Sequence, residues 1–263
     1  MEVMVAIRQT PILRGEVVLT ADKKSVDISG LKTHINEWDL YALEEAMRLQ
    51  SENGAKVTAA CVGGKTAEEA LYYCLAAGVD EAVLIEDDSA CYLDSWLIAD
   101  LLTKFAAKRS YDLLLTGVQS EDTGCGEVGG ILASMMGISQ AAAVMKIQSI
   151  VEGDAVVVER ELDEGYTDIR RLTLPALLTI QTGINLPRYV SSMRLRKTRK
   201  RGGIIQISSM DLYKESVPPE PKKTVEKVFL PEVGSSDLEF IEGSNPVDQA
   251  NNLVDRLREM GVI

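Results

Sequence analysis

The chain has 263 residues, of which 46% are hydrophobic and only 5% aromatic, and a formal net charge of −12 at pH 7. This composition is typical of a globular protein with a sizeable core, and its apolar runs are too short to cross a bilayer. The single histidine, His34, excludes most Ser/His and Cys/His catalytic arrangements and most multi-histidine metal sites, so neither catalytic residues nor metal ligands are predicted.

Cysteine spacing and the start of the chain bear on its location. The cysteines are dispersed without a C-x-x-C pair, which favours free thiols over a zinc site or a redox dithiol: Cys61, Cys74, Cys91 and Cys125. A first strand begins directly after Met1-Glu2, without the basic start and long apolar region of a secretory signal. We expect a cytoplasmic protein without a membrane span.

Strands and helices alternate through the first half of the chain. Apolar runs predict strands at residues 3–7, 56–62, 82–85 and 113–116, and a hairpin pairing 17–19 with 26–28. Helical spacing and caps predict helices from about residue 40 to Gly54, from a capping box at Thr66 to Gly78, from a cap at Asp94 or Ser95 to about 107, and over 128–136. This order predicts an α/β fold with a doubly wound, mainly parallel Rossmann-like sheet.

The pattern changes after residue 136. Strands are expected at about 144–150, 156–162 and 167–174, with a turn at Glu164-Gly165, as a small antiparallel addition, and residues 177–181 are expected to return to the main sheet. Proline-rich sequence and a last helix over about 247–260 follow. We therefore divide the chain into a nucleotide-binding domain, residues 1–187, and an extended arm, residues 188–263, that wraps a partner.

A glycine-rich acidic loop follows the strand at 113–116. Its glycines would let backbone amides approach an anion at the start of the next helix, which favours a mononucleotide phosphate loop. A purely structural turn and an NAD fingerprint stay open, although residues 124–129 follow the fourth strand and Lys146 and Gln148 stand where the ribose carboxylate belongs. Asn36 to Asp39 either cap a helix or line the same nucleotide.

A second candidate surface is basic. Residues 188–202 hold seven of the 28 basic residues and no acid, which leaves 21 basic residues against 40 acidic ones elsewhere. Such asymmetry favours docking of a protein partner over a solvated loop, and nucleic acid is not expected because aromatic residues are scarce in this segment and the body is acidic.

Several segments together resemble the beta subunit of electron-transferring flavoprotein along essentially the whole chain. They are residues 5–10, 36–46, 117–119, 158–165, 175–179 and 185–189. The Asn-Glu-Trp-Asp segment and residues 180–185 are most similar to the branch that serves trimethylamine dehydrogenase.

The resemblance implies a heterodimer with an alpha subunit that holds most of the redox-active FAD, and an electron carrier rather than an enzyme. The chain would bind AMP in a structural role, and Leu13 would touch the flavin ring shared at the interface. The implied AMP-binding residues are Ala6, Asn36, Glu37, Trp38, Asp39, Ala59, Gly117, Val118, Gln119, Ser120, Glu121, Asp122, Thr123, Gly124, Cys125, Gly126, Glu127 and Val128.

Docking of a flavin-dependent dehydrogenase is implied for the basic segment, through Arg188, Ser192, Met193, Arg194, Arg196 and Lys197. Ser192 stands where the family usually carries a leucine anchor. Electron-bifurcating relatives hold a second FAD in place of AMP; residues 128–129 fit that variant too, and AMP is favoured. Two classes outside the family remain as alternatives, an ATP-using adenylyl transferase or pyrophosphatase and a small adenine-binding stress or sensor protein.

Overall fold

Two compact units make up the described chain, Met1–Lys227 and Val228–Ile263. The computed structural model describes residues 1–13, 17–87, 94–151, 153–214, 217–230 and 238–263. Cys91 lies outside the described residues. Within the described ranges, no helix combines the length and apolar character needed to cross a membrane.

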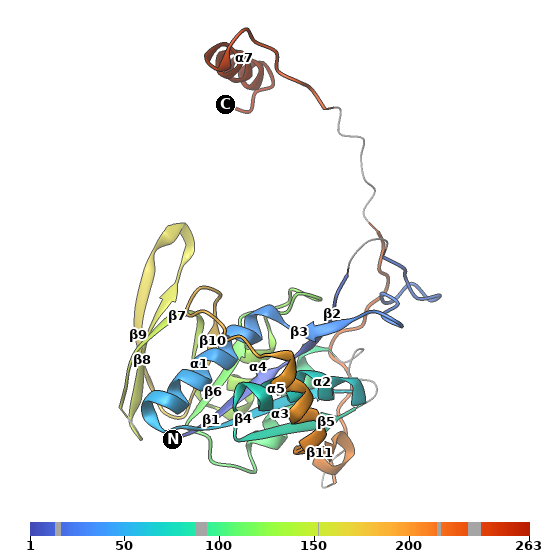
Figure 1. Ribbon diagram of the computed structural model, residues 1–263, viewed down its shortest axis with the longest axis vertical. Coiled ribbons are helices and arrows are strands. Elements are labelled where there is room, and N and C mark those ends of the chain that lie inside the picture. Colours follow the sequence, from blue (N-terminus) through green and yellow to red (C-terminus); the bar gives the residue numbers. More distant parts are fainter. Residues whose placement is uncertain (14–16, 88–93, 152, 215–216, 231–237) are drawn as a thin grey trace. The chain divides into compact units, whose positions relative to one another are not determined.

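A nine-stranded sheet runs through the first unit in the order β11-β5-β4-β1-β6-β10-β7-β8-β9 (Figure 1). The strands from β11 to β7 are parallel, and β8 pairs antiparallel with both of its neighbours, β7 and β9. This arrangement confirms the predicted doubly wound sheet with its antiparallel addition. The strands are β1 Glu2–Ile7, β4 Lys56–Gly63, β5 Glu81–Glu86, β6 Leu113–Gly117, β7 Ser139–Val151, β8 Ala155–Glu161, β9 Thr167–Thr173, β10 Ala176–Ile180 and β11 Ile204–Ser208.

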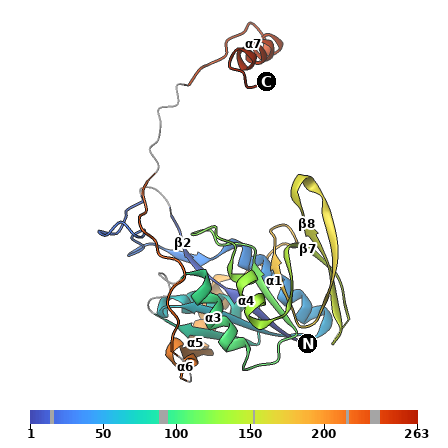
Figure 2. The ribbon, with the colours of Figure 1, turned by 180° about the vertical axis from the view of Figure 1, so that it is seen from behind.

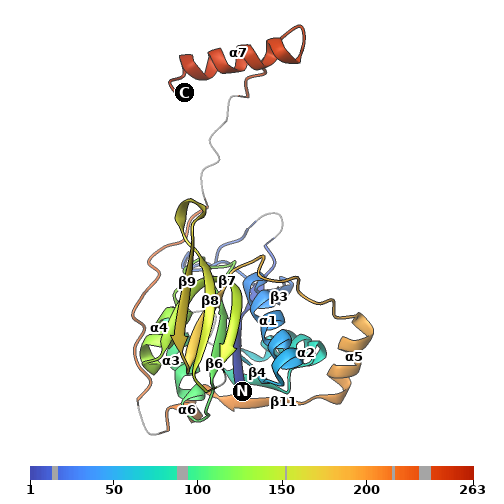
Figure 3. The same ribbon diagram turned by 90° about the vertical axis from the view of Figure 1, so that its left-hand side faces the viewer.

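Helices cover both faces of the sheet (Figures 2 and 3). Alternate residues of β1 point to opposite faces, so that Val3 and Val5 belong to one apolar core and Met4 to the other. One face carries α1 Glu37–Asn53, α2 Glu68–Ala77 and α5 Ser192–Arg201; the other carries α3 Ser95–Ala106, α4 Val128–Met136 and α6 Ser209–Leu212.

Most predicted helix ends are confirmed. Gly54 ends α1 in the left-handed conformation, and the Asp94 side chain caps α3 by accepting the Leu97 N–H. The capping box at Thr66 is wrong, because the chain leaves β4 in a 3-10 turn, η1 (Lys65–Ala67), and Ala67 caps α2 without a side-chain bond. Ala67 is buried against Gly63, which fixes this tighter entry.

The hairpin expected at residues 17–28 is reduced to one bridge, Leu19 to Val26. Val18 and Ile28 stay 58% and 42% exposed, so this segment has no face to bury and forms no longer ladder. The paired strands lie at its ends instead, where β2 (Gln9–Pro11) meets β3 (Thr33–Ile35) in antiparallel register.

The chain does not leave the sheet at residue 188. After α5 it adds β11 in parallel to the edge strand β5, and the first unit extends to Lys227, so the division by structure lies about 40 residues beyond the predicted one. A free strand edge offers unpaired backbone groups, which β11 satisfies. The second unit contains α7 (Pro246–Glu259), where the sequence predicts a helix, with Asn245 capping its first amides.

Candidate nucleotide site and docking helix

The carboxyl ends of β1 and β6 lie side by side. From β1 the chain passes through α1 to β4 on one side, whereas β6 pairs with β1 on the other side, so the strand order reverses between β1 and β6. Ligands of open α/β sheets bind in the crevice at such a point. The segment after β1 and the loop of residues 118–127 after β6 therefore face the same crevice.

A buried carboxylate joins the two strand ends. Asp39 is 5% exposed, and its oxygens accept the N–H of Arg8 at 2.7 Å and the N–H of Gly117 at 2.9 Å. A Cβ at Gly117 would lie 2.5 Å from Asp39 Oδ1, so only glycine permits this approach. Burial raises the pKa of Asp39 to about 7, although the two amide bonds favour the charged form.

Asn36, at the start of α1, holds the loop through two hydrogen bonds to its backbone. Its side chain is buried, with Nδ2 donating to the Gln119 carbonyl at 2.8 Å and Oδ1 accepting the Glu121 N–H at 3.0 Å. The predicted residues Asn36 and Asp39 thus use their polar atoms to position the loop backbone. Direct contact with a ligand would fall to other groups of the loop.

Two acids of the loop, Glu121 and Asp122, also bind the rest of the fold. We call their contacts, together with those of Asn36 and Asp39, the clasp. Asp122 accepts from Arg8 through both carboxylate oxygens, with Nη2 2.6 Å from Oδ2, and the pKa of Asp122 is lowered by this partner although burial opposes the shift. Glu121 accepts the backbone N–H of Glu37 at 3.0 Å and lies 2.7 Å from Nε2 of His34. The loop is therefore tied to β1, α1 and β3.

Between the clasp and α4, the loop contributes backbone groups rather than long side chains beside the helix start. Gly124 and Gly126 both have φ +63, and a Cβ at Gly124 would meet no atom within 4 Å. The α4 N-cap residue, Glu127, makes no side-chain cap bond. The first backbone amides of the helix are therefore not satisfied by this side chain and can bind another acceptor. Gly129 seats α4 on the sheet, since a Cβ there would lie 2.6 Å from Thr179 Cγ2.

The other predicted nucleotide residues lie in the sheet, in α1, in the loop and at the start of α4. Ala6 and Ala59 lie in the sheet, 8% and 0% exposed, so their side chains form core. Trp38 Nε1 donates to Gln181 Oε1 at 3.2 Å, which links α1 to the end of β10. The remaining loop residues follow β6 at the crevice and include the hydrogen-bonded pair Ser120 and Thr123: Val118, Ser120, Thr123 and Cys125. Val128 is the first residue of α4 and packs against the core.

Sequence reasoning missed four residues at this site, the first of which is Arg8, the partner of Asp122. Thr10 and His34 come from β2 and β3 and reach the loop through Glu121. Lys223 forms an ion pair with Glu127, and the backbone N–H groups of Lys222 and Lys223 donate to Asp94. The Pro-Lys-Lys run was visible in the sequence, but nothing in it indicates that the chain crosses the starts of α3 and α4.

The basic segment forms a helix that is fastened at its root. Arg188 makes a two-pronged bond to Glu44 of α1, with Nε 2.7 Å from Oε2 and Nη2 3.0 Å from Oε1. Arg199 pairs with Glu69 of α2. These two cations hold the segment against the neighbouring helices, so they are not free for a partner.

The remaining cations of α5 face solvent. Within the described part of the chain they have no acidic partner: Arg194, Arg196, Lys197, Lys200 and Arg201. Leu186, Tyr189 and Met193 are exposed by 88%, 87% and 82% in the same segment, and Ser192 is also exposed. The docking residues predicted from sequence, apart from Arg188, thus share an exposed surface that is both basic and apolar.

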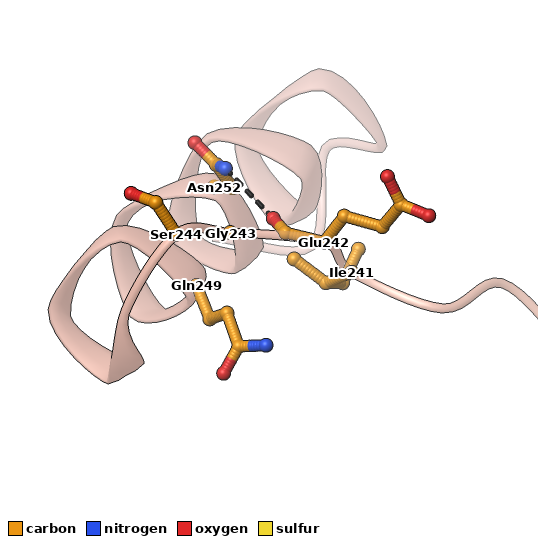
Figure 4. A pocket seen from close by; sticks show the side chains of 6 residues that line it. All are labelled: Ile241, Glu242, Gly243, Ser244, Gln249 and Asn252. Carbon is orange, nitrogen blue, oxygen red and sulfur yellow. Dashed lines mark hydrogen bonds between the residues drawn. The ribbon is translucent and has the colours of Figure 1, made fainter.

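A hollow in the second unit lies beside α7 (Figure 4). Asn252 donates to the Glu242 carbonyl at 2.9 Å, and Gly243 lies so close to Gln249 that a Cβ would be 2.5 Å from its backbone nitrogen. These contacts fold the segment before α7 onto the helix. The lining brings no cation or buried polar group together, so we assign it no ligand: Ile241, Glu242, Gly243, Ser244, Gln249 and Asn252.

Comparison with known proteins decides the family. Residues 24–211 match the family model of the electron transfer flavoprotein domain. The chain belongs to this family. Proteins named electron transfer flavoprotein subunit beta from Methylophilus methylotrophus and Bacillus subtilis are 31% and 33% identical to it, and each alignment covers 98% of both chains. The subunit beta of Thermoanaerobacterium thermosaccharolyticum is 32% identical over the full length of both.

Family membership assigns a role to the geometry. As a member of the electron transfer flavoprotein beta subunits, the chain takes part in electron transfer, and its relatives are named as carrier subunits rather than as typical enzymes. This member of the family has a loop held at the sheet crevice by the start of α1, and a basic helix fastened to α1 and α2.

Proposed function

We propose that this chain is the beta subunit of a heterodimer that carries electrons from a flavin-dependent dehydrogenase to an acceptor. Its alpha subunit would hold most of the FAD, and this chain would hold AMP in a structural role. The proposal rests on the loop that the clasp holds in place. This loop ends at the start of α4, where the N-cap residue makes no side-chain cap bond.

The loop suits a resident adenylate. The Gly124 amide donates to the Ser120 carbonyl at 2.8 Å, so the phosphate donors would be the backbone amides from Gly126 onwards, at the positive end of α4, and no catalytic side chain is required. The carboxylate of Asp122 is paired with Arg8, and that of Glu121 is occupied by contacts with His34, Thr10 and the Glu37 N–H, so both repel an anion less than free carboxylates would. FAD in the same loop, as in bifurcating relatives, is the competing occupant, and no contact of the described residues favours it.

The flavin would supply the redox chemistry when bound with the alpha subunit. This chain would supply a rigid base and a residue at the flavin edge, Leu13, which is 48% exposed directly after β2. The segment that ends in α7 would contact the alpha subunit, since its helix presents Leu253 and Val254 at 44% and 36% exposure.

Docking of the dehydrogenase falls to α5. Its unpaired cations would steer an acidic partner, and the exposed Met193 would provide the apolar contact that a leucine provides in relatives. Arg188 would contribute indirectly, because its ion pair with Glu44 holds the segment in place. We assign the partner to the trimethylamine dehydrogenase type, from the similarity of residues 36–39 and 180–185, and the complex to the cytoplasm.

Coexpression with the alpha subunit tests this function. We expect a one-to-one complex whose FAD absorbance bleaches when the dehydrogenase and its substrate are added. A stable, colourless homodimer of this chain would instead favour a sensor protein. Magnesium-dependent turnover of ATP by the purified chain would favour an adenylyl transferase or pyrophosphatase.

A further inference from the structure

Glu121 is a junction between the nucleotide loop and three other elements. Its Oε1 accepts the Glu37 N–H of α1 at 3.0 Å. Its Oε2 accepts the Thr10 hydroxyl of β2 at 3.3 Å and lies 2.7 Å from His34 Nε2 of β3. Its own N–H donates to Asn36 at 3.0 Å. One side chain therefore joins the loop to both strands of the small β2–β3 sheet.

Burial makes this junction more than a surface contact. Thr10 is 0% exposed, so its hydroxyl depends on Glu121 for a hydrogen-bond acceptor. The side chain of Glu121 is 26% exposed and that of His34 is 42% exposed, so water reaches their contact only in part. Loss of the carboxylate would leave Thr10 with its hydroxyl buried and unpaired.

The β2–β3 sheet is short, and among its described residues Ile35 is buried in the core and Gln9 donates to the Thr66 carbonyl at 2.9 Å. Its strands pair over Gln9–Pro11 and Thr33–Ile35, and the described part of the segment between them closes with the bridge Leu19 to Val26. Short two-stranded ladders are marginal alone. The bonds to Glu121 therefore help to fix this segment, and they join it to the nucleotide loop, in which Glu121 lies five residues before the glycine Gly126.

We infer that Glu121 couples the two structures, so that an adenylate held by the loop also orders the β2–β3 segment and the exposed apolar residues that it carries. This inference rests on the proposed nucleotide role. Glu121 acts here as a positioning residue, since its carboxylate is occupied by protein donors and is not needed for contact with the phosphate. If bound adenylate stabilises the ordered β2–β3 sheet by a given factor, then the ordered sheet must raise the affinity for adenylate by the same factor.

The single histidine gives this coupling a clean probe. In the full chain labelled with ¹³C-histidine, AMP is expected to shift the His34 ring resonance and to slow amide exchange in residues 9–12 and 33–35 on the order of tenfold. In Glu121→Gln both effects should be lost. Glu52→Gln, an exposed carboxylate at the far end of α1, is the matched control and should retain them.

AMP affinity, measured separately by equilibrium dialysis, keeps the outcomes distinct. If the wild-type chain binds AMP but His34 and the β2–β3 amides do not respond, the coupling is overturned while the nucleotide role stands. If the wild-type chain binds no AMP, the proposed function itself fails. Should Glu121→Gln bind no AMP, His34→Gln decides: a several-fold loss of affinity supports the coupling, and unchanged affinity overturns it.

Discussion

The guanidinium of Arg188 lies on the carboxylate of Glu44, and the backbone N–H of Arg188 donates to the same carboxylate at 3.0 Å. This relationship separates two roles within one run of basic residues. Arg188 anchors the segment that leads to α5, whereas the cations of α5 other than Arg199 face solvent. Charge in this segment therefore serves both folding and recognition, at different positions.

Neutralising the solvent-facing cations should slow electron transfer. We expect the triple variant Arg194→Gln, Arg196→Gln, Lys197→Gln to lower the rate from the dehydrogenase by roughly tenfold or more at low ionic strength, because steering charges raise association rates. Stopped-flow bleaching of the flavin measures this rate. A matched triple at Lys56, Lys108 and Lys146 should change it little, and equal rates for both triples at low salt would contradict the docking role.

Breaking the ion pair between Arg188 and Glu44 should lower the free energy of unfolding. The decrease should differ according to which partner is replaced. Glu44 is the buried partner, at 10% side-chain exposure against 37% for Arg188. We expect Arg188→Ala to destabilise by about 1–2 kcal/mol, because it leaves a buried carboxylate with only a backbone donor, and Glu44→Gln by less. Urea unfolding measures both. The reverse order would argue that the ion pair does not anchor the segment.

Asp39 should give the fold a defined pH dependence. Its folded pKa of about 7 lies above the ordinary value of 3.8, so the folded state binds this proton more tightly. The stability due to this carboxyl is therefore greatest below pH 4 and is lost as the pH rises to about 7. The stability difference between wild type and Asp39→Asn should fall by roughly 1–4 kcal/mol over that range. A constant difference in urea midpoints would contradict the shift.

Two adjacent glycines provide a test of how α4 is seated. A Cβ at Gly129 would lie 2.6 Å from Thr179 Cγ2, whereas at Gly130 the nearest atom would be 3.6 Å away. We expect Gly129→Ala to destabilise by about 1–3 kcal/mol through overpacking and to weaken nucleotide binding. Gly130→Ala should be neutral or stabilise by up to about 1 kcal/mol, since alanine favours a helix. Thermal unfolding of the pair reads this out, and similar effects at both positions would count against the close packing.

The main sheet could be predicted because each signal was local. The run Leu113 to Leu115 and the stop at Gly54 follow from period and cap chemistry alone, and the structure confirms both. The place of β11 could not be predicted, because the sequence of residues 204–208 does not say which strand edge is free. Thr66 misled because a cap motif cannot reveal that a preceding 3-10 turn has already begun the helix.

The candidate site was only partly visible in the sequence. Glycine spacing and the acidic loop marked the crevice, since those features depend on neighbouring residues. The partners Thr10, His34 and Lys223 come from distant segments, and their contacts depend on the folded topology. The family resemblance implied a ligand-binding role for Asn36 and Asp39, which stays a prediction, whereas their side-chain atoms in the structure bind loop backbone.

The account depends most on a nucleotide that stays in the loop. Heat or acid release from the purified heterodimer, followed by chromatography and mass spectrometry, measures its identity and amount directly. We predict one AMP and one FAD for each heterodimer, with the AMP retained through electron-transfer turnover. Two FAD molecules, or no adenylate at all, would contradict the role that we assign to the loop.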